Sequence, residues 1–328
     1  MQGEYIRTES RFRHWVTADG APGPTGDGGF AAAPNRYHLY VSYACPWAHR
    51  TLIVRVLKGL QDIIPISVVH PIMPPDSWTF GDYPGSTGDR VQGLATLADL
   101  YQQVAPGFDG LVTVPVLYDT ERRTIVNNES SEIVRMFNRA FDAWGRADLD
   151  LYPEPLREEI DAVNAEVYEG VNNGVYRVGF ATTQAAYDAA YDRLFTALDR
   201  LEARLGKQPY LVGDRPTEAD WRLFPTLIRF DAVYYSHFKC NRQRLIDFPN
   251  LWGYTQRLYQ VPGIADTVRI DHIKAHYYGS HPTLNPTGII PKGPALSFDL
   301  PAGRGAGVTG VKMTQERGAR TDPAPRDL

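Results

Sequence analysis

The sequence predicts a mixed α/β domain followed by an all-helical domain. Between residues 37 and 145 the segments follow the order strand, helix, strand and then strand, strand, helix, whereas no convincing strand occurs after Pro153 and Pro155. The chain has 328 residues, enough for two domains with extensions. With 43% hydrophobic and 22% charged residues its composition is ordinary for a globular protein, which excludes wholesale disorder.

The charge balance and the cysteine content exclude several partners and compartments. Lys and Arg total 34 against 38 Asp and Glu, a net charge of -4 without a long basic block, which argues against a nucleic-acid partner. No stretch approaches the ~20 apolar residues of a membrane span, and the charged N-terminal segment has no apolar export signal. Only Cys45 and Cys240 are present, which fits a reducing compartment. We therefore expect a cytoplasmic protein with no membrane partner.

Four segments are expected along the chain. They are an irregular N-terminal arm (1–36), the α/β domain (37–145), the helical domain (150–280) and an irregular C-terminal extension (281–328). The arm is rich in Gly, Ala and Pro with little periodicity, and Pro and Gly likewise exclude regular elements from the extension.

The first strand and the helix after it meet at Cys45. Residues 37–43 read YHLYVSY, rich in the aromatic and β-branched residues that favour strands. Pro46 stands where the first turn of a helix tolerates proline. Between Trp47 and Leu60, apolar residues recur at helical spacing, so a helix is expected there.

The rest of the α/β domain follows from similar patterns. Strands are expected at 63–69 (IIPISVV), 112–119 (VTVPVLYD) and 123–128 (RTIVNN). Helices are expected at 94–104 and at 129–141, the latter with acidic residues in its first turn. The long insertion at 70–92 is rich in Pro, Gly and Asp and carries Trp78, and such loops are usually functional.

Helices are expected in the second domain at 157–179, 184–206, 217–233 and 249–260. Thr217 precedes the third of these and can cap its backbone, while Asp220 can reach back in a variant of the capping box.

Cys45 is the candidate nucleophile. At a helix N-terminus it meets unpaired backbone N–H groups and the positive end of the helix dipole, so we expect its pKa to lie below that of an ordinary thiol. His49 and Arg50, one turn later, could add positive potential. Thioredoxin-like domains present a reactive sulfur in this order of strand, Cys, Pro and helix. Position 48 is alanine, so the second sulfur of a Cys-x-x-Cys pair is missing, and an external thiol such as glutathione must resolve a mixed disulfide on Cys45.

A second group of residues suits glutathione. Val114-Pro115 opens a strand, where proline suggests an edge or a cis bond that leaves the Val114 backbone free to pair with a peptide ligand. Glu129 and Ser130 open the next helix, where backbone N–H groups and a hydroxyl suit a carboxylate and Glu129 suits an ammonium. Alternatively, Glu129 and Ser130 merely begin a helix well.

Several segments together resemble one family. They are YHLYVSYACPWAHRTLIVRVLKGL, TVPVLYD, NNESSEIVRMFN, NNGVYRVGFAT, PTEADWRLFPTLIRFD and DHIKAHYYGSH, in order between about Phe12 and Pro294. The chain resembles the glutathionyl-hydroquinone reductases, the Xi class of glutathione transferases. The most discriminating pieces are Cys-Pro-Trp-Ala, NNGVY and HYYGSH, because Cys-Pro with an aromatic is shared with the Omega class.

The resemblance implies a fold, an activity and site residues. The fold is a thioredoxin-like domain with a C-terminal helical domain, in a homodimer. The activity is reductive removal of glutathione from glutathionyl-hydroquinones, with glutathione as cosubstrate and no metal. Cys45 matches the nucleophile. The implied glutathione contacts are Trp78, Val114, Glu129 and Ser130, and the implied aromatic pocket for the hydroquinone holds Tyr176 and Tyr277. The family often has an arginine before Val-Thr-Val-Pro; this chain has Leu111, so that contact is not implied here.

Other chemical readings of these residues are weaker. A phenol can donate to a hydroquinone oxygen, but with 19 tyrosines a core role for Tyr176 or Tyr277 is the simpler reading from position alone. His272 and His276, at i and i+4, lack a third ligand at matching spacing and predict pocket or surface residues. Cys240 lacks the cationic helix-start context and is taken as incidental.

Two other functions stay open from the sequence. One is an Omega-like thioltransferase or dehydroascorbate reductase using the same sulfur on smaller oxidants. The other is a non-catalytic glutathione-fold binding module in which Cys45 is a relic.

Overall fold

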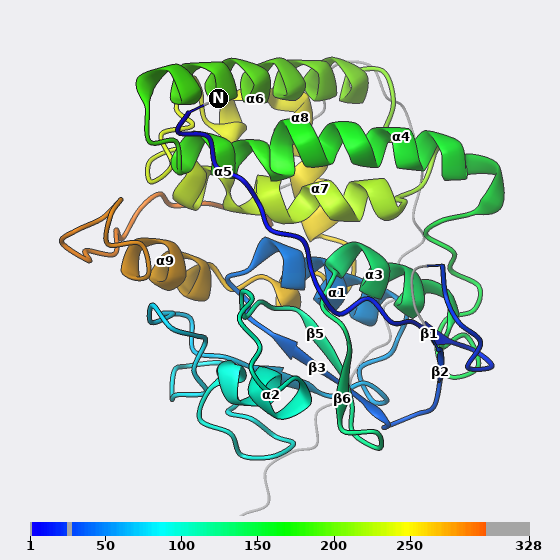
Figure 1. The fold of residues 1–328 in the computed structure, drawn as a ribbon. Coiled ribbons are helices and arrows are strands. Elements are labelled where there is room, and N and C mark those ends of the chain that lie inside the picture. The colour runs from blue at the N-terminus through cyan, green and yellow to red at the C-terminus, as the bar shows by residue number, and fades with distance from the viewer. Residues whose placement is uncertain (1, 25–27, 300–328) are drawn as a thin grey trace, which may run out of the picture.

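The computed structural model describes residues 2–24 and 28–299, and it places the helical domain on top of the α/β domain (Figure 1). The part of the expected C-terminal extension beyond residue 299 lies outside the described residues. The four segment boundaries stay predictions. Within the described ranges, no helix is both long enough and apolar enough to cross a bilayer.

A four-stranded mixed sheet forms the centre of the α/β domain, in the order β4-β3-β5-β6. The strands are β3 (Tyr37–Val41), β4 (Ile66–Val68), β5 (Val116–Asp119) and β6 (Thr124–Asn127). β3 runs parallel to β4 and antiparallel to β5, and β5 is antiparallel to β6. All four predicted strands are confirmed, each shorter than its sequence pattern.

Three helices cover this sheet: α1 (Pro46–Leu57), α2 (Leu97–Val104) and α3 (Ser130–Arg139). α1 begins with Pro46 and is followed by Gly59, whose φ of 67° turns the chain away. α2 begins at Leu97, later than the pattern suggested, because Thr96 and Asp99 form a capping box there. α1 and α3 lie between the sheet and the helical domain, with α2 on the other side of the sheet (Figure 1).

The helical domain contains the helices that the sequence predicts, with two interruptions. They are α4 (Arg157–Val167), α5 (Gly174–Gly179), α6 (Gln184–Leu205), α7 (Glu218–Arg229) and α8 (Pro249–Tyr259). A π-helical turn at Tyr168–Asn172 separates α4 from α5, and a second at Phe230–Tyr234 extends α7. The Thr217 N–H donates to Asp220 Oδ2 at 2.7 Å, which confirms that Asp220 reaches back to the start of α7. Single turns of 3-10 helix occur at Glu154–Leu156, Leu245–Asp247 and Ala265–Thr267.

One helix was not predicted: α9 (Ile270–Gly279). The residues from His272 to Tyr278 are all buried, so this helix has no solvent-exposed face along those turns and shows no amphipathic period.

The sequence suggested an irregular N-terminal arm, but the arm contains two short strands. Its two-residue strands β1 (Val16–Thr17) and β2 (Phe30–Ala31) pair in parallel. Such short strands leave no periodicity to detect. The arm also bridges the two domains (Figure 1): Gly3 O accepts from the Thr182 N–H at 3.0 Å, and Arg13 pairs with Glu132 of α3.

Candidate active site

Cys45 lies in the turn between β3 and α1, as the sequence predicts. It is the N-cap of α1 with extended backbone angles, φ -74° and ψ 122°. Its thiol donates to the Val114 carbonyl at 3.4 Å, and the Val114-Pro115 peptide bond is cis. The sulfur and the start of β5 therefore lie side by side, although 69 residues separate them in the chain.

The expected lowering of the Cys45 pKa is wrong in its net direction. Burial raises the pKa of the thiol, because it removes the water that would solvate a thiolate. The backbone N–H groups of Ala48 and Trp47 and the charges of Arg229 and Arg7 act in the opposite direction but do not outweigh burial. The helix start supplies the predicted hydrogen bonds, yet desolvation is the larger effect.

The sequence suggested that His49 adds positive potential near the thiol, but the structure shows that it does not. His49 is fully buried, and burial together with the Arg229 charge holds its pKa well below the usual range. Arg229 donates to Nδ1 at 2.9 Å, so the ring carries its proton on Nε2, which lies 2.8 Å from Thr267 Oγ1. His49 is neutral, and the nearby cations are Arg229 and Arg7 instead.

Val114, Glu129 and Ser130 line one interdomain cleft of about 830 Å³. Burial acts to raise the pKa of Glu129, but hydrogen bonds from Ser131 and the charges of Arg50 and Arg13 outweigh it, so Glu129 is held as a carboxylate. The Ser130 hydroxyl is buried without a hydrogen-bond partner in the part of the chain that the structure describes. The cleft thus offers a backbone edge, an anion and an unused hydroxyl close together.

Trp78 does not line this cleft with them. It is 5% exposed and stacks on His276 of α9, with ring centroids 4.9 Å apart. A contact between Trp78 and glutathione therefore stays a prediction.

The two histidines of α9 bind backbone carbonyls. His272 Nε2 lies 2.8 Å from Pro84 O, and His276 Nδ1 lies 2.9 Å from Pro71 O. Among residues 2–24 and 28–299, no group of three metal-ligating side chains occurs.

Tyr176 and Tyr277 meet in the helical domain. Their hydroxyl oxygens lie 2.7 Å apart, and burial raises the pKa of both phenols well above the usual range, so both keep their protons. Tyr176 also stacks on Trp47, two residues after Cys45. The Cys45 charge further raises the pKa of Tyr176, which places the phenol within electrostatic reach of the sulfur. The structure therefore brings the two predicted tyrosines together, with Tyr176 stacked on the tryptophan that follows Cys45 by two residues.

Sequence reasoning missed a third phenol. Tyr234 is fully buried in the π-helical turn after α7, and its hydroxyl lies 2.9 Å from that of Tyr277. Phe238 packs against all three phenol rings, at centroid distances of 5.4 to 5.5 Å. The same ring fills the space beside Gly179, where a Cβ atom would lie 2.3 Å from Phe238 Cγ.

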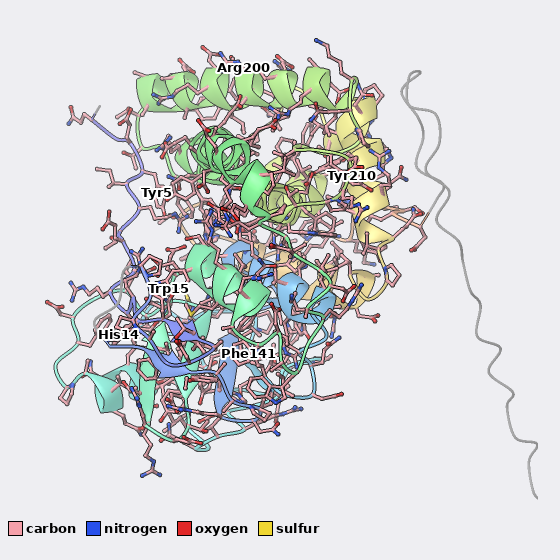
Figure 2. The ribbon with its side chains drawn as sticks, turned by 90° about the vertical axis from the view of Figure 1, so that its right-hand side faces the viewer. Tyr5, His14, Trp15, Phe141, Arg200 and Tyr210 are labelled. Atoms are coloured by element: carbon pink, nitrogen blue, oxygen red, sulfur yellow. The ribbon has the colours of Figure 1, made fainter. Side chains whose placement is uncertain are left out.

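The N-terminal arm also contributes to the site. Tyr5 stacks on Tyr176, and the Arg7 guanidinium lies 4.6 Å and 4.8 Å from the ring centroids of Trp47 and Tyr176. Figure 2 shows the arm passing from Tyr5, beside the helical domain, down to Trp15. No sequence signal marked these residues, because the arm has no periodicity and their partners are distant in the chain.

Comparisons with known proteins agree with this architecture. The glutathione S-transferase N-terminal domain family matches residues 44–140, and the glutathione S-transferase C-terminal domain family matches residues 184–257. The chain is 56% identical over 303 residues to the glutathionyl-hydroquinone reductase YqjG of Escherichia coli (strain K12), a match covering 92% of each chain. It is 50% identical over 293 residues to the glutathionyl-hydroquinone reductase PcpF of Sphingobium chlorophenolicum, covering 89% of this chain and 90% of that protein.

Solved structures give the same result. The glutathione-bound structure of YqjG superposes with a TM-score of 0.87, covering 89% of this chain and 95% of that one. The glutathione S-transferase Xi from Phanerochaete chrysosporium, 51% identical, superposes with a TM-score of 0.84, covering 88% and 97%. Identity at this level over most of both chains shows more than a shared fold. The chain therefore belongs to the glutathionyl-hydroquinone reductases, the Xi class of glutathione transferases.

Proposed function

We propose that this protein removes glutathione from glutathionyl-hydroquinones, with glutathione as cosubstrate. One observation carries the proposal: Cys45 begins α1, and Trp47 in the first turn of that helix stacks on Tyr176, which belongs to a buried cluster of proton-bearing phenols. The thiol of Cys45 comes from the thioredoxin-like domain, and the phenols of Tyr176 and Tyr277 come from the helical domain. A thiol suits attack on sulfur, and phenols suit an aromatic leaving group with ring oxygens.

The first half of the reaction makes a mixed disulfide. The Cys45 thiolate attacks the glutathionyl sulfur, a new S–S bond forms, and the bond between sulfur and ring carbon breaks. When the ring reacts as its keto tautomer, the released electron pair moves onto the ring oxygen. That oxygen takes up one proton, and free hydroquinone leaves.

The second half regenerates the enzyme. A second glutathione, as its thiolate, attacks the glutathionyl sulfur on Cys45 and releases the Cys45 thiolate with oxidised glutathione. In sum, a glutathionyl-hydroquinone and glutathione give hydroquinone and glutathione disulfide: the ring carbon is reduced and two glutathione sulfurs are oxidised.

Glutathione binding is assigned to the cleft beside Cys45. The Val114 backbone is proposed to pair with its peptide, and Ser130 with its γ-glutamyl carboxylate, since that hydroxyl is unused. The Glu129 carboxylate suits the γ-glutamyl ammonium. Trp78 stays a predicted contact with no assigned step.

The phenols are assigned to the hydroquinone. Because burial keeps Tyr176 and Tyr277 protonated, each can donate to the ring oxygen on which charge develops. This assignment distinguishes the proposal from an Omega-like thioltransferase, which needs no donor for an aryl oxygen.

Mass spectrometry of the protein mixed with a glutathionyl-hydroquinone tests the proposal. One glutathionyl group on Cys45 together with released hydroquinone is expected, and glutathione should then remove the adduct. The Cys45→Ser variant is the control and should form neither product. Hydroquinone release without the adduct would contradict the mechanism. An adduct formed from small glutathione disulfides alone would favour the Omega-like function.

Two further expectations accompany this function. We place the protein in the reducing cytoplasm, which suits its two free cysteines. A homodimer is proposed on the family resemblance alone, and light scattering of the purified protein tests it.

A further inference from the structure

Arg229 ends α7 in the helical domain and is fully buried. Its side chain makes four hydrogen bonds. Nε donates to Ala44 O at 2.9 Å and Nη2 to Tyr43 O at 2.8 Å. Nη1 donates to Pro225 O at 2.8 Å and to His49 Nδ1 at 2.9 Å. Every one of these partners is formally neutral, so within the described residues the guanidinium is buried without a bonded carboxylate.

Two of these acceptors are the residues directly before Cys45 in the chain. A cation from one domain therefore fixes the backbone that presents the sulfur of the other domain, across 185 and 186 residues of sequence. Fixing Tyr43 and Ala44 also fixes where the N-cap residue starts α1. The contact is too specific to serve only as general packing between domains.

A buried cation with only neutral acceptors is electrostatically incomplete. Removing a charge from water is costly unless an opposite charge compensates it. The thiolate form of Cys45 is the anion that can form beside this cation during the reaction. Deprotonation of Cys45, with its proton passing to solvent, would therefore complete the ion pair that Arg229 lacks.

We propose that Arg229 is the fixed counter-charge of the Cys45 thiolate and the residue that positions the turn presenting it. The nucleophile is then controlled from the helical domain as well as by the helix start on which it lies. Arg229 is a positioning residue, because it acts through the backbone and its charge without touching the substrate.

The other groups around Cys45 are consistent with this role. The Arg229 charge lowers the pKa of Cys45, and Arg7 from the arm acts in the same direction. Tyr176 and Tyr234, which also interact electrostatically with Cys45, are neutral phenols. His49 cannot supply the charge, because Arg229 itself keeps that ring neutral. Arg229 is the cation bonded to the turn before the thiol.

Two variants separate the charge of Arg229 from its hydrogen bonds. Arg229→Lys keeps the charge but cannot reproduce the forked contacts, whereas Arg229→Gln keeps hydrogen-bond donors without charge. Arg55→Gln is the matched control. Arg55 is also a buried arginine bonded to backbone carbonyls, those of Ile64 and Gln61, but it lies in the last turn of α1, away from Cys45.

The readout is the rate of iodoacetamide alkylation of the Cys45 peptide against pH, followed by mass spectrometry so that Cys240 does not interfere. In Arg229→Gln the inflection should move upward by about one pH unit, which is about a tenfold loss of thiolate at neutral pH. Arg229→Lys should stay closer to wild type than Arg229→Gln, and Arg55→Gln should not shift.

Three outcomes would overturn the proposal. They are an unshifted inflection in Arg229→Gln, equal shifts in both Arg229 variants, and an equal shift in Arg55→Gln. Circular dichroism checks that each variant is folded. If Arg229→Gln does not fold, the Lys variant decides: its inflection should remain near wild type, and a shift of a full unit or more would contradict the counter-charge.

The inference rests on the proposed role of Cys45 as nucleophile, but its test needs no hydroquinone. Alkylation reports the thiolate whether or not the enzyme turns over glutathionyl-hydroquinones. Absence of hydroquinone turnover in the wild type with a normal Arg229 effect would thus refute only the proposed substrate.

Discussion

The site has a thiol half, formed by Cys45 and the turn before it, and a phenol half, formed by Tyr176, Tyr234 and Tyr277. Burial raises the pKa in both halves. In the thiol half this opposes the chemistry, because a nucleophile must lose its proton. In the phenol half it supports the chemistry, because a donor must keep its proton.

This difference explains why the two halves are built differently. Around the thiol, two backbone N–H groups and two guanidinium groups favour the anion. Around the phenols, aromatic rings pack closely and the hydroxyl groups bond one another. In a site without water, a group that must lose its proton therefore needs hydrogen bonds and positive charges that favour its anion, whereas burial alone suffices for a group that must keep its proton.

The largest expected effect comes from the thiol half. Cys45→Ser should leave less than about a tenth of the wild-type turnover on every substrate, because a hydroxyl at neutral pH cannot form a disulfide. Steady-state rates with a glutathionyl-hydroquinone and with a small glutathione mixed disulfide measure it. A variant that keeps more than this on either substrate would refute the role of Cys45.

The next largest effect should separate the halves. Tyr277→Phe or Tyr176→Phe removes one donor but keeps the ring, so turnover of glutathionyl-hydroquinones should fall about 10²–10³-fold if water stays excluded. Reduction of a small glutathione mixed disulfide should be nearly unchanged, because it presents no aryl oxygen.

Tyr254→Phe is the matched control for these variants. Tyr254 is another fully buried phenol of the helical domain, and it donates to Asp220 at 2.7 Å in a contact that belongs to the start of α7. Loss of this hydrogen bond should lower the thermal stability of the protein and leave its turnover unchanged. Equal losses on both substrates in the Tyr176 and Tyr277 variants would show that these residues only maintain the fold.

The pH dependence should expose the opposed effects of burial. Since burial disfavours the thiolate, the alkylation rate of Cys45 should still be rising where free cysteine, of pKa ~8.5, levels off. Below its pKa the rate should increase about tenfold per pH unit, because only the anion reacts. An inflection below the free-cysteine value would show that the N–H groups and cations outweigh burial.

The smallest effect should come from the end of the phenol cluster. Tyr234→Phe removes the hydrogen bond to Tyr277 but no proposed contact to substrate, so a loss of about fivefold is expected, equivalent to about 1 kcal/mol. The loss should fall on kcat with glutathionyl-hydroquinones and be absent with small disulfides. A loss as large as that of Tyr277→Phe would instead make Tyr234 a direct donor.

The same two halves differ in how far the sequence predicts them. The order of strand, Cys45, Pro46 and helix is local, so the position of the sulfur follows from neighbouring residues. Val114-Pro115 and the helix start at Glu129 are local signals too, and the structure places both at the cleft. Local pattern was sufficient wherever one turn or one cap fixes a side chain.

The rest of the site depends on contacts between distant segments. Arg229 meets the turn before Cys45 from 185 residues away, and Tyr5 reaches Tyr176 from an arm without periodicity. The direction of the Cys45 pKa was also wrong, because burial depends on how the domains pack and cannot be seen at a helix start alone. Helix α9 was missed for the same reason. Its residues from His272 to Tyr278 are buried by other segments of the chain, and this burial cannot be seen in the sequence pattern.

The ring of Phe238 also determines which positions around the phenol cluster can accept substitutions. It touches all three phenols and leaves no space beside Gly179 even for a methyl group. Phe238 is itself fully buried, so it cannot swing aside to admit a larger neighbour. A library that randomises position 179 should therefore return almost only glycine. Variants with altered ring preference should arise from the arm, where Tyr5 stacks on Tyr176 but is only partly buried and so has room to change.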